Sequence, residues 1–310
     1  MTDLEITRIG LPTGVTLTVQ LGGPATAEAI VLLHGFPESH RTWREVAPAL
    51  AADYRVVAPD QRGFAGSDKP EGVEHYKADR IVEDIIALAD ALELETFTLV
   101  GHDWGGAVAW LAALRHPDRV ARLVIVNAPH PLVFQKTVVE DEAQRAASQY
   151  IRAFRSPLME AGIKAMGLAT FFEKTFGSHA DLSRISAEER QAYLDEWGQE
   201  GALTAMLNWY RASEIEVPEI GERASAPIWT KLPFPHVTMP TLVIWAMKDR
   251  ALHPVQLDGL HELVDDLRIV TIVDAGHFVP WEQPEPIVEA IRDFIAETGQ
   301  SQVGDSRPEA

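Results

Sequence analysis

Three residues that could carry out hydrolysis each follow a predicted strand of the chain. Asp103 stands at the centre of Gly101-His102-Asp103-Trp104-Gly105, where glycines frame a sharp strand-to-helix turn that exposes the central side chain. Asp249 follows the apolar run 241–245, and His277 follows the run 267–273. Because parallel strands end at the same edge of a sheet, we expect the three residues to meet as a catalytic triad of nucleophile, acid and base.

A carboxylate at the turn indicates a particular chemistry. Asp103 is ionised at neutral pH and needs no base before it attacks, but attack on a carbonyl would give an anhydride. It suits displacement at a saturated carbon, which leaves an ester on the protein. His277, oriented by Asp249, would then activate a water that hydrolyses the ester. The residues therefore predict a hydrolase whose leaving group is a halide or the oxygen of an epoxide.

An oxyanion site is expected beside the turn. His34-Gly35-Phe36-Pro37 follows the predicted strand 29–33, and Gly35 lets the backbone approach closely. The N–H groups of Phe36 and Trp104 are the expected donors, since Pro37 has no N–H.

Other polar residues have less informative surroundings. Asn127 follows the strand ending at Val126, where a carboxylate could also serve as the acid, but an amide cannot. Asp60 and Arg62 are predicted to form a structural ion pair at a loop. His34 and His102 are expected to be structural hydrogen bonders, and a further group of histidines is expected at the surface: His40, His75, His116, His179 and His261.

The hydrophobic pattern predicts an α/β fold with a mostly parallel, doubly wound sheet and an inserted helical cap. Strands are predicted at 29–33, 54–58, 97–100 and 123–126, and 78–92 has helical spacing. After Pro131 the pattern is helical (141–154, 158–176 and 187–213) until strands return at 241–245 and 267–273, before a closing helix over 287–298. The predicted units are a core of 1–131 and 236–298, a cap of 132–235, and a disordered tail of 299–310.

Composition limits the classes of partner. The net charge of −19 argues against binding to nucleic acid or to an anionic membrane surface. Without cysteine the chain has no disulfide and no thiolate metal site, which fits a cytoplasmic location. No apolar run reaches membrane-spanning length, and the first residues lack the pattern of a signal peptide. We expect a monomer or homodimer that needs no cofactor or metal and acts on a small molecule and water.

Over residues 10–297 the chain resembles the α/β-hydrolase-fold epoxide hydrolases. Some of the motifs that carry this resemblance are shared with haloalkane dehalogenases: His34 to Ser39 with Trp43, Asp60 to Ser67, Gly101 to Gly106, and Gly276-His277. Two segments of the predicted cap favour the epoxide hydrolases. QYIRAFRSP contains Tyr150 and LNWYRA contains Tyr210. The resemblance implies that Tyr150 and Tyr210 donate protons to the epoxide oxygen as its ring opens.

Two alternatives stay open. In a haloalkane dehalogenase the Trp104 indole would bind halide, together with a second donor; Pro37 and Glu38 exclude the asparagine version, but Trp197, Trp209 and Trp229 are available. A remote alternative is a non-catalytic ligand-binding protein on the same fold. The residues expected to line the substrate pocket are Trp104, Phe36, Pro37, Phe154, Trp209 and Phe278.

Overall fold

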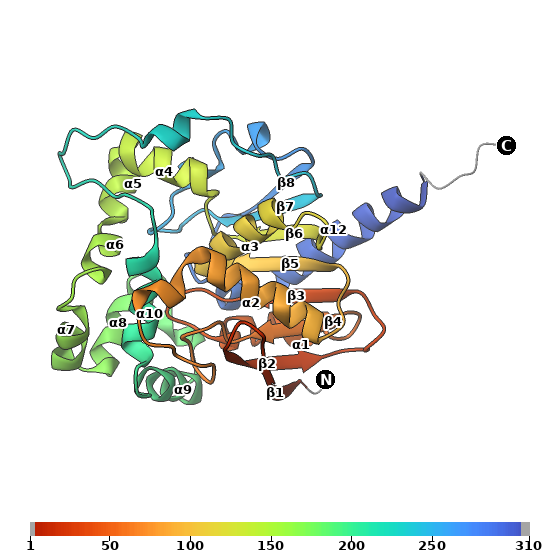
Figure 1. The fold of residues 1–310 in the computed structure, drawn as a ribbon, viewed down its shortest axis with the longest axis horizontal. Helices are drawn as coiled ribbons and strands as arrows, with labels where there is room; N and C mark the ends of the chain where they lie inside the picture. Colours follow the sequence, from red (N-terminus) through yellow and green to blue (C-terminus); the bar gives the residue numbers. More distant parts are fainter. Residues whose placement is uncertain (1–3, 305–310) are drawn as a thin grey trace.

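A single eight-stranded sheet organises the protein, for which the computed structural model describes residues 4–304, with side chains to 299. The strand order is β1-β2-β4-β3-β5-β6-β7-β8 (Figure 1). β2 is antiparallel to β1 and β4, and every other pairing is parallel. The strands are β1 (Glu5–Gly10), β2 (Thr16–Gly22), β3 (Ala29–Leu33), β4 (Arg55–Pro59), β5 (Phe97–His102), β6 (Val120–Val126), β7 (Thr241–Ala246) and β8 (Leu267–Ile272).

Two hydrophobic layers cover the two faces of the sheet. Side chains alternate between them along β3, with Val31 and Leu33 in one layer and Ile30 and Leu32 in the other. The first layer includes residues of α2 (Ala78–Ala91) and α3 (Trp104–Arg115), and the second includes α1 (Val46–Leu50), α11 (Val279–Glu282) and α12 (Pro284–Gly304). The short helices η1 (His40–Trp43), η2 (Val73–Tyr76), η5 (Pro254–Leu257) and η6 (Leu260–Glu262) lie in the connections.

A block of helices separates β6 from β7 and gathers beyond one end of the sheet (Figure 1). Its members are α4 (Pro131–Glu140), α5 (Glu142–Ala147), α6 (Gln149–Phe154), α7 (Met159–Met166), α8 (Leu168–Gly177), η3 (Leu182–Arg184), α9 (Ala187–Trp197), α10 (Ala202–Ala212) and η4 (Ile228–Lys231). We call this block the cap. It lies at the edge where β5 delivers Asp103 to the start of α3.

The predicted fold class is confirmed, with differences in detail. β1 and β2 were not predicted, because the solvent reaches every residue of β1 and only three residues of β2 are buried. The three long helices predicted in the cap are each broken, at Ser148, at Gly167 and over 198–201, and Gly167 has a φ of 84° that ends a helix. α12 continues to Gly304, so residues 299–304 are helical instead of a tail, while 305–310 lie outside the described residues.

Within the described residues, no helix has the length and apolar character needed to cross a membrane.

Candidate active site

Asp103 projects from a tight turn between β5 and α3. Its φ of 50° lies in the left-handed region, which non-glycine residues rarely adopt and which is often found at functional positions. The turn is crowded: a Cβ on Gly35 would lie 2.4 Å from the Cβ of Asp103, and a Cβ on Gly105 would lie 2.3 Å from the Leu33 carbonyl oxygen. Because both positions are glycine, the turn at Asp103 and the loop after β3 can lie in contact.

The loop after β3 meets the Asp103 carboxylate directly. The backbone N–H of Phe36 donates a hydrogen bond to Asp103 Oδ1 over 2.8 Å. Trp104 is the first residue of α3, where N–H groups have no acceptor within the helix. The two predicted oxyanion residues, Phe36 and Trp104, therefore flank the carboxylate from separate elements.

The structure brings Asp103, His277 and Asp249 together from three strand ends. His277 Nε2 lies 3.6 Å from Asp103 Oδ2, and His277 Nδ1 lies 2.8 Å from Asp249 Oδ2. The Asp103 and His277 side chains are only 12% and 7% exposed. The imidazole thus bridges two buried carboxylates, with Nε2 directed at the candidate nucleophile.

Asp249 is held by four donors. Its Oδ1 accepts from the backbone N–H groups of Ala251 and Leu252, at 2.8 and 2.9 Å. Its Oδ2 accepts from Asn127 Nδ2 at 2.9 Å in addition to His277. Asn127 also accepts from the Ala246 N–H through Oδ1, at 2.7 Å. Asn127 therefore helps to orient Asp249. Its position after β6 in the sequence did not predict this contact.

The electrostatics of the triad favour an ion pair. Burial alone would raise the pKa values of Asp103 and Asp249, but hydrogen bonding to His277 and its charge hold both below their ordinary values. Burial alone would lower the pKa of His277, but the charge of Asp249 and hydrogen bonds to both aspartates raise it well above 6.5. Two carboxylates thus hold His277 as an imidazolium.

The two cap tyrosines lie in an aromatic cluster that includes Trp104 and Phe36, the two residues flanking the Asp103 carboxylate. Tyr150 in α6 and Tyr210 in α10 have ring centroids 6.0 Å apart. Tyr210 also meets Phe36 at 4.9 Å, Phe154 at 5.0 Å and Trp104 at 5.2 Å. Burial, followed by the charge of Asp103, raises the pKa of Tyr150; burial also raises that of Tyr210. Both phenols therefore keep their protons at neutral pH.

The remaining residues predicted for the pocket have other contacts. Trp209 packs between Phe64 and Trp104, and its indole N–H donates to the Arg62 carbonyl at 3.1 Å. Pro37 accepts from the Trp197 indole N–H through its carbonyl, at 2.7 Å. Phe278 is buried against His277, with ring centroids 5.0 Å apart. Phe36, Trp104 and Phe154 join the aromatic cluster, while Trp209 lies behind it.

The predicted ion pair between Asp60 and Arg62 is wrong. Arg62 pairs with Asp84, Nε to Oδ2 at 2.5 Å, and Asp60 pairs with His40 at 2.8 Å. Neighbouring residues of a loop point to different sides, so closeness in sequence did not make them partners.

One histidine predicted at the surface is not there: His40 is buried against Asp60. His179, in the cap, is partly exposed, and its ring centroid lies 6.1 Å from that of His277. His34 and His102 are the hydrogen bonders that were predicted: His34 Nε2 accepts from the Gln61 N–H, and His102 Nε2 lies 2.8 Å from the His277 carbonyl oxygen.

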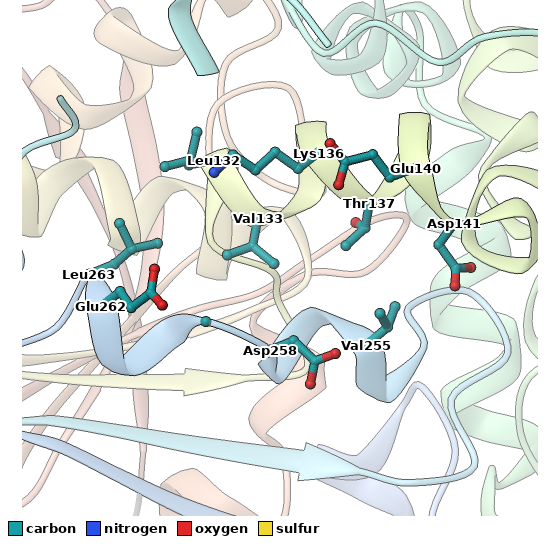
Figure 2. Close-up of a pocket in the computed structure, with 11 residues that line it drawn as sticks. Leu132, Val133, Lys136, Thr137, Glu140, Asp141, Val255, Asp258, Glu262 and Leu263 are labelled. Carbon is teal, nitrogen blue, oxygen red and sulfur yellow. The ribbon is translucent and has the colours of Figure 1, made fainter. Parts of the chain in front are cut away.

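A separate cavity of about 330 Å³ lies between α4 and the segment 255–263 (Figure 2). Its lining mixes apolar and acidic side chains with Lys136, and none of these residues belongs to the triad or the tyrosine pair. No group of three or more His, Asp or Glu side chains among residues 4–299 is arranged to hold a metal ion.

Comparison with known proteins places this geometry in context. The family described as the alpha/beta hydrolase fold matches residues 28–284. The chain is 35% identical to the AB hydrolase superfamily protein YfhM of Bacillus subtilis (strain 168), over 91% of this chain and 95% of that protein. It is 32% identical to epoxide hydrolase 3 of Xenopus tropicalis, over 92% of this chain and 76% of the relative.

A solved structure is also similar. It is described as one of the "Novel epoxide hydrolases belonging to the alpha/beta hydrolases superfamily in metagenomes from hot environments". The TM-score is 0.87 and the sequence identity 45%, and the match covers 94% of this chain and 99% of the other.

Proposed function

The chain belongs to the alpha/beta hydrolase fold family, and we propose that it opens epoxides to vicinal diols through an ester on Asp103. The observation that carries this proposal is a buried carboxylate with a backbone N–H on one oxygen, beside an aromatic cluster that holds two protonated phenols. The names of the relatives, which include epoxide hydrolases, support it.

The first step is ring opening. Asp103 Oδ2 attacks a ring carbon, the carbon–oxygen bond of the epoxide breaks, and the oxygen takes a proton from Tyr150 or Tyr210. Oδ1 stays on the Phe36 N–H and becomes the carbonyl oxygen of the ester. Two donors facing one oxygen stabilise the negative charge that develops as the ring opens.

The second step is hydrolysis of the ester. His277 removes a proton from a water that attacks the Asp103 carbonyl carbon. Negative charge then develops on Oδ1, where the N–H groups of Phe36 and Trp104 stabilise it. The leaving oxygen of the diol takes the proton that His277 removed, which leaves Asp103 as a carboxylic acid bearing the second hydrogen of the water. That proton returns to the tyrosinate, so the cycle consumes one water and releases no net proton.

The charge on His277 changes when it is needed as a base. In the free protein, two carboxylates favour the imidazolium form. Esterification removes the charge of Asp103, which lowers the pKa of His277 because one stabilising anion is lost. Alkylation thereby prepares His277 for the second step.

The dehalogenase alternative has less support from these contacts. Halide release needs free N–H donors near Asp103. The Trp197 and Trp209 indoles donate to backbone carbonyls, and the Trp104 ring packs edge-on against Tyr210 at 5.2 Å.

The test is the intact mass of His277→Gln protein incubated separately with styrene oxide and with a bromoalkane. Without the base, the ester should accumulate, and a gain equal to the whole epoxide with no bromoalkane adduct would support the proposal. A gain of the alkyl group alone, with bromide released, would identify a dehalogenase. The control is the double variant Asp103→Ala, His277→Gln, which should gain no mass; labelling of this control would place the nucleophile elsewhere.

A further inference from the structure

A buried carboxyl group lies behind the candidate active site. The Glu38 side chain is fully buried, two residues after Phe36. Its Oε1 accepts from the Tyr193 hydroxyl of α9 at 2.9 Å and from the Trp281 indole N–H of α11 at 3.0 Å. Its Oε2 has no hydrogen-bond partner among the described residues. One oxygen of the carboxyl group is thus satisfied twice and the other not at all.

A buried ring nitrogen near Oε2 is also unpartnered among the described residues. His102 is fully buried, and its Nδ1 lies 3.9 Å from Glu38 Oε2. The other ring nitrogen, Nε2, lies 2.8 Å from the His277 carbonyl oxygen. A carbonyl oxygen only accepts, so Nε2 must carry a hydrogen. In neutral His102, Nδ1 therefore carries a lone pair and no hydrogen. If Glu38 were ionised, this lone pair would face the lone pairs of the carboxylate, in a site shielded from bulk solvent.

We propose that Glu38 and His102 share one buried proton between Oε2 and Nδ1, which makes them a positioning pair behind His277. With that proton in place, one group can donate to the other once the two atoms close from 3.9 Å to hydrogen-bond distance, and neither buried atom is then left unpaired. An unpaired buried donor or acceptor destabilises a folded protein, so this site has reason to retain the proton.

The charges around the pair favour the same state. Burial raises the pKa of Glu38 to about 7, although Arg44, the hydrogen bonds from Tyr193 and Trp281, and the nearby Thr42 hydroxyl oppose the shift. Burial, followed by the charge of His277, lowers the pKa of His102 to about 4, although Asp103, its bond to the His277 carbonyl and Asp249 oppose that shift. The proton therefore belongs on the carboxyl group in mildly acid solution and is lost as the pH rises through neutrality.

The pair connects three segments of the candidate active site. Glu38 belongs to the loop of Phe36, and His102 immediately precedes Asp103. His102 also holds the His277 carbonyl, and Trp281 follows four residues after His277. Loss of the shared proton would cause repulsion between the Glu38 carboxylate and the lone pair on His102 Nδ1, at the point where these segments meet. Its effect on turnover rests on the proposed function, but the proton itself does not.

Glu38→Gln is the decisive substitution. A glutamine amide can donate to His102 Nδ1 while its carbonyl accepts from Tyr193 and Trp281, so it imitates the protonated acid permanently. We expect the variant to keep turnover within a few-fold of wild type at about pH 6. At about pH 9 it should keep most of that turnover, whereas wild type falls several-fold. A variant as impaired as Glu38→Ala at both pH values would overturn the pair.

Folding stability gives a second measure. The folded state holds the Glu38 proton up to about pH 7, whereas the unfolded chain releases it near 4.5. Stability therefore falls as the pH rises between these two values, and it levels off above them. The melting temperature of Glu38→Gln relative to wild type should rise over this window. Tyr193→Phe is the matched control, because it removes a neighbouring hydrogen bond but keeps the acid; its difference from wild type should show no such rise.

A direct readout separates this inference from the proposed function. Infrared spectra and nitrogen-15 NMR of the histidines, assigned with His102→Gln, report where the proton resides. At about pH 6 we expect a protonated carboxyl, or a protonated Nδ1 on His102, that disappears in Glu38→Gln and in alkaline wild type. An ionised Glu38 beside a neutral His102 at that pH would overturn the pair, whether or not the protein opens epoxides.

Discussion

Asp103 and Asp249 show how surroundings assign different roles to one residue type. Four donors surround Asp249 and leave its oxygens little freedom to react. Asp103 accepts from Phe36 through one oxygen, while the other faces His277 at 3.6 Å and remains available. The difference fits a fixed acid that orients the base and a free carboxylate that attacks.

The phenols of the cap give a first prediction at this scale. Tyr210→Phe should slow ester formation about 10²-fold, the lower range for a lost general acid, and Tyr150→Phe should act in the same direction. Rapid-quench measurement of the ester on Asp103 with styrene oxide checks this. Tyr76→Phe is the control, since that buried hydroxyl donates to the Pro70 carbonyl. An unchanged rate of ester formation in both cap variants would remove their role.

The pH dependence of the two chemical steps gives a second prediction. Ester hydrolysis needs neutral His277, so its rate should rise with pH until the lowered pKa of the esterified protein is passed. Ring opening does not need a neutral His277. Intact mass during turnover should therefore show more ester at about pH 5 than at about pH 8. Asp249→Asn removes an anion beside His277, so the rise in the rate of ester hydrolysis should occur at lower pH. An ester fraction that does not change with pH would contradict this scheme.

The sequence predicted individual residues well where chemistry and strand ends coincide. Asp103, Asp249 and His277 each follow a strand of the parallel part of the sheet, so the fold alone brings them near one another. The contacts of Asn127, His179 and Glu38 depend on how loops and cap pack, and no local pattern encodes them.

At the scale of elements, helix α9 links the cap to the connection after β3 that contains Phe36. Trp197 donates to the Pro37 carbonyl, and Tyr193 donates to Glu38. Arg41 adds ion pairs to Glu189 and Glu196 at 3.0 and 2.8 Å. The loop residues in these contacts follow closely after Phe36, so the cap helps to set the position of the N–H that faces Asp103.

Trp197→Phe tests this coupling. The substitution keeps an aromatic ring but leaves the Pro37 carbonyl unpaired, which should cost about 1–3 kcal/mol of folding stability. Turnover should also fall several-fold, because the loop that holds the Phe36 N–H loses an anchor. Trp110→Phe is a matched control: it removes a buried indole bond to the Ala128 carbonyl at 3.2 Å, away from the loop. Equal losses of turnover in the two variants would deny α9 a specific role.

The elements themselves were predictable in proportion to their burial. The apolar runs of β3, β5 and β6 are buried on both faces and could be recognised from the sequence. β1 lies at the edge of the sheet with a partly or fully exposed residue at every position, so it gave no such signal. The breaks within the cap helices depend on tertiary packing as well as on Gly167 and Gly201, which periodicity does not reveal.

For the whole molecule, charge is the dominant feature of the surface. The chain has 46 acidic residues against 27 basic ones. Such an excess repels itself in the compact state, and salt screens that repulsion over about 8–10 Å at physiological strength. The melting temperature should therefore rise by a few degrees between low salt and about 0.3 M sodium chloride. Potassium chloride should act equally, because screening ignores ion identity. A fall with salt would mean that the surface ion pairs contribute more than repulsion costs.

The cap leaves the sheet and returns to it at neighbouring strands. β6 ends at Val126, and the chain returns at Thr241, the start of β7, which pairs with Leu123 of β6; the two attachment points therefore lie three residues apart along the pairing, although more than a hundred residues of chain separate them. Evolution can therefore lengthen, shorten or exchange this insertion without changing the strand pairing that positions Asp103 and His277. The core can keep one chemistry while successive caps adapt it to different molecules, and chimaeras joined at these two points would inherit their selectivity from the cap donor.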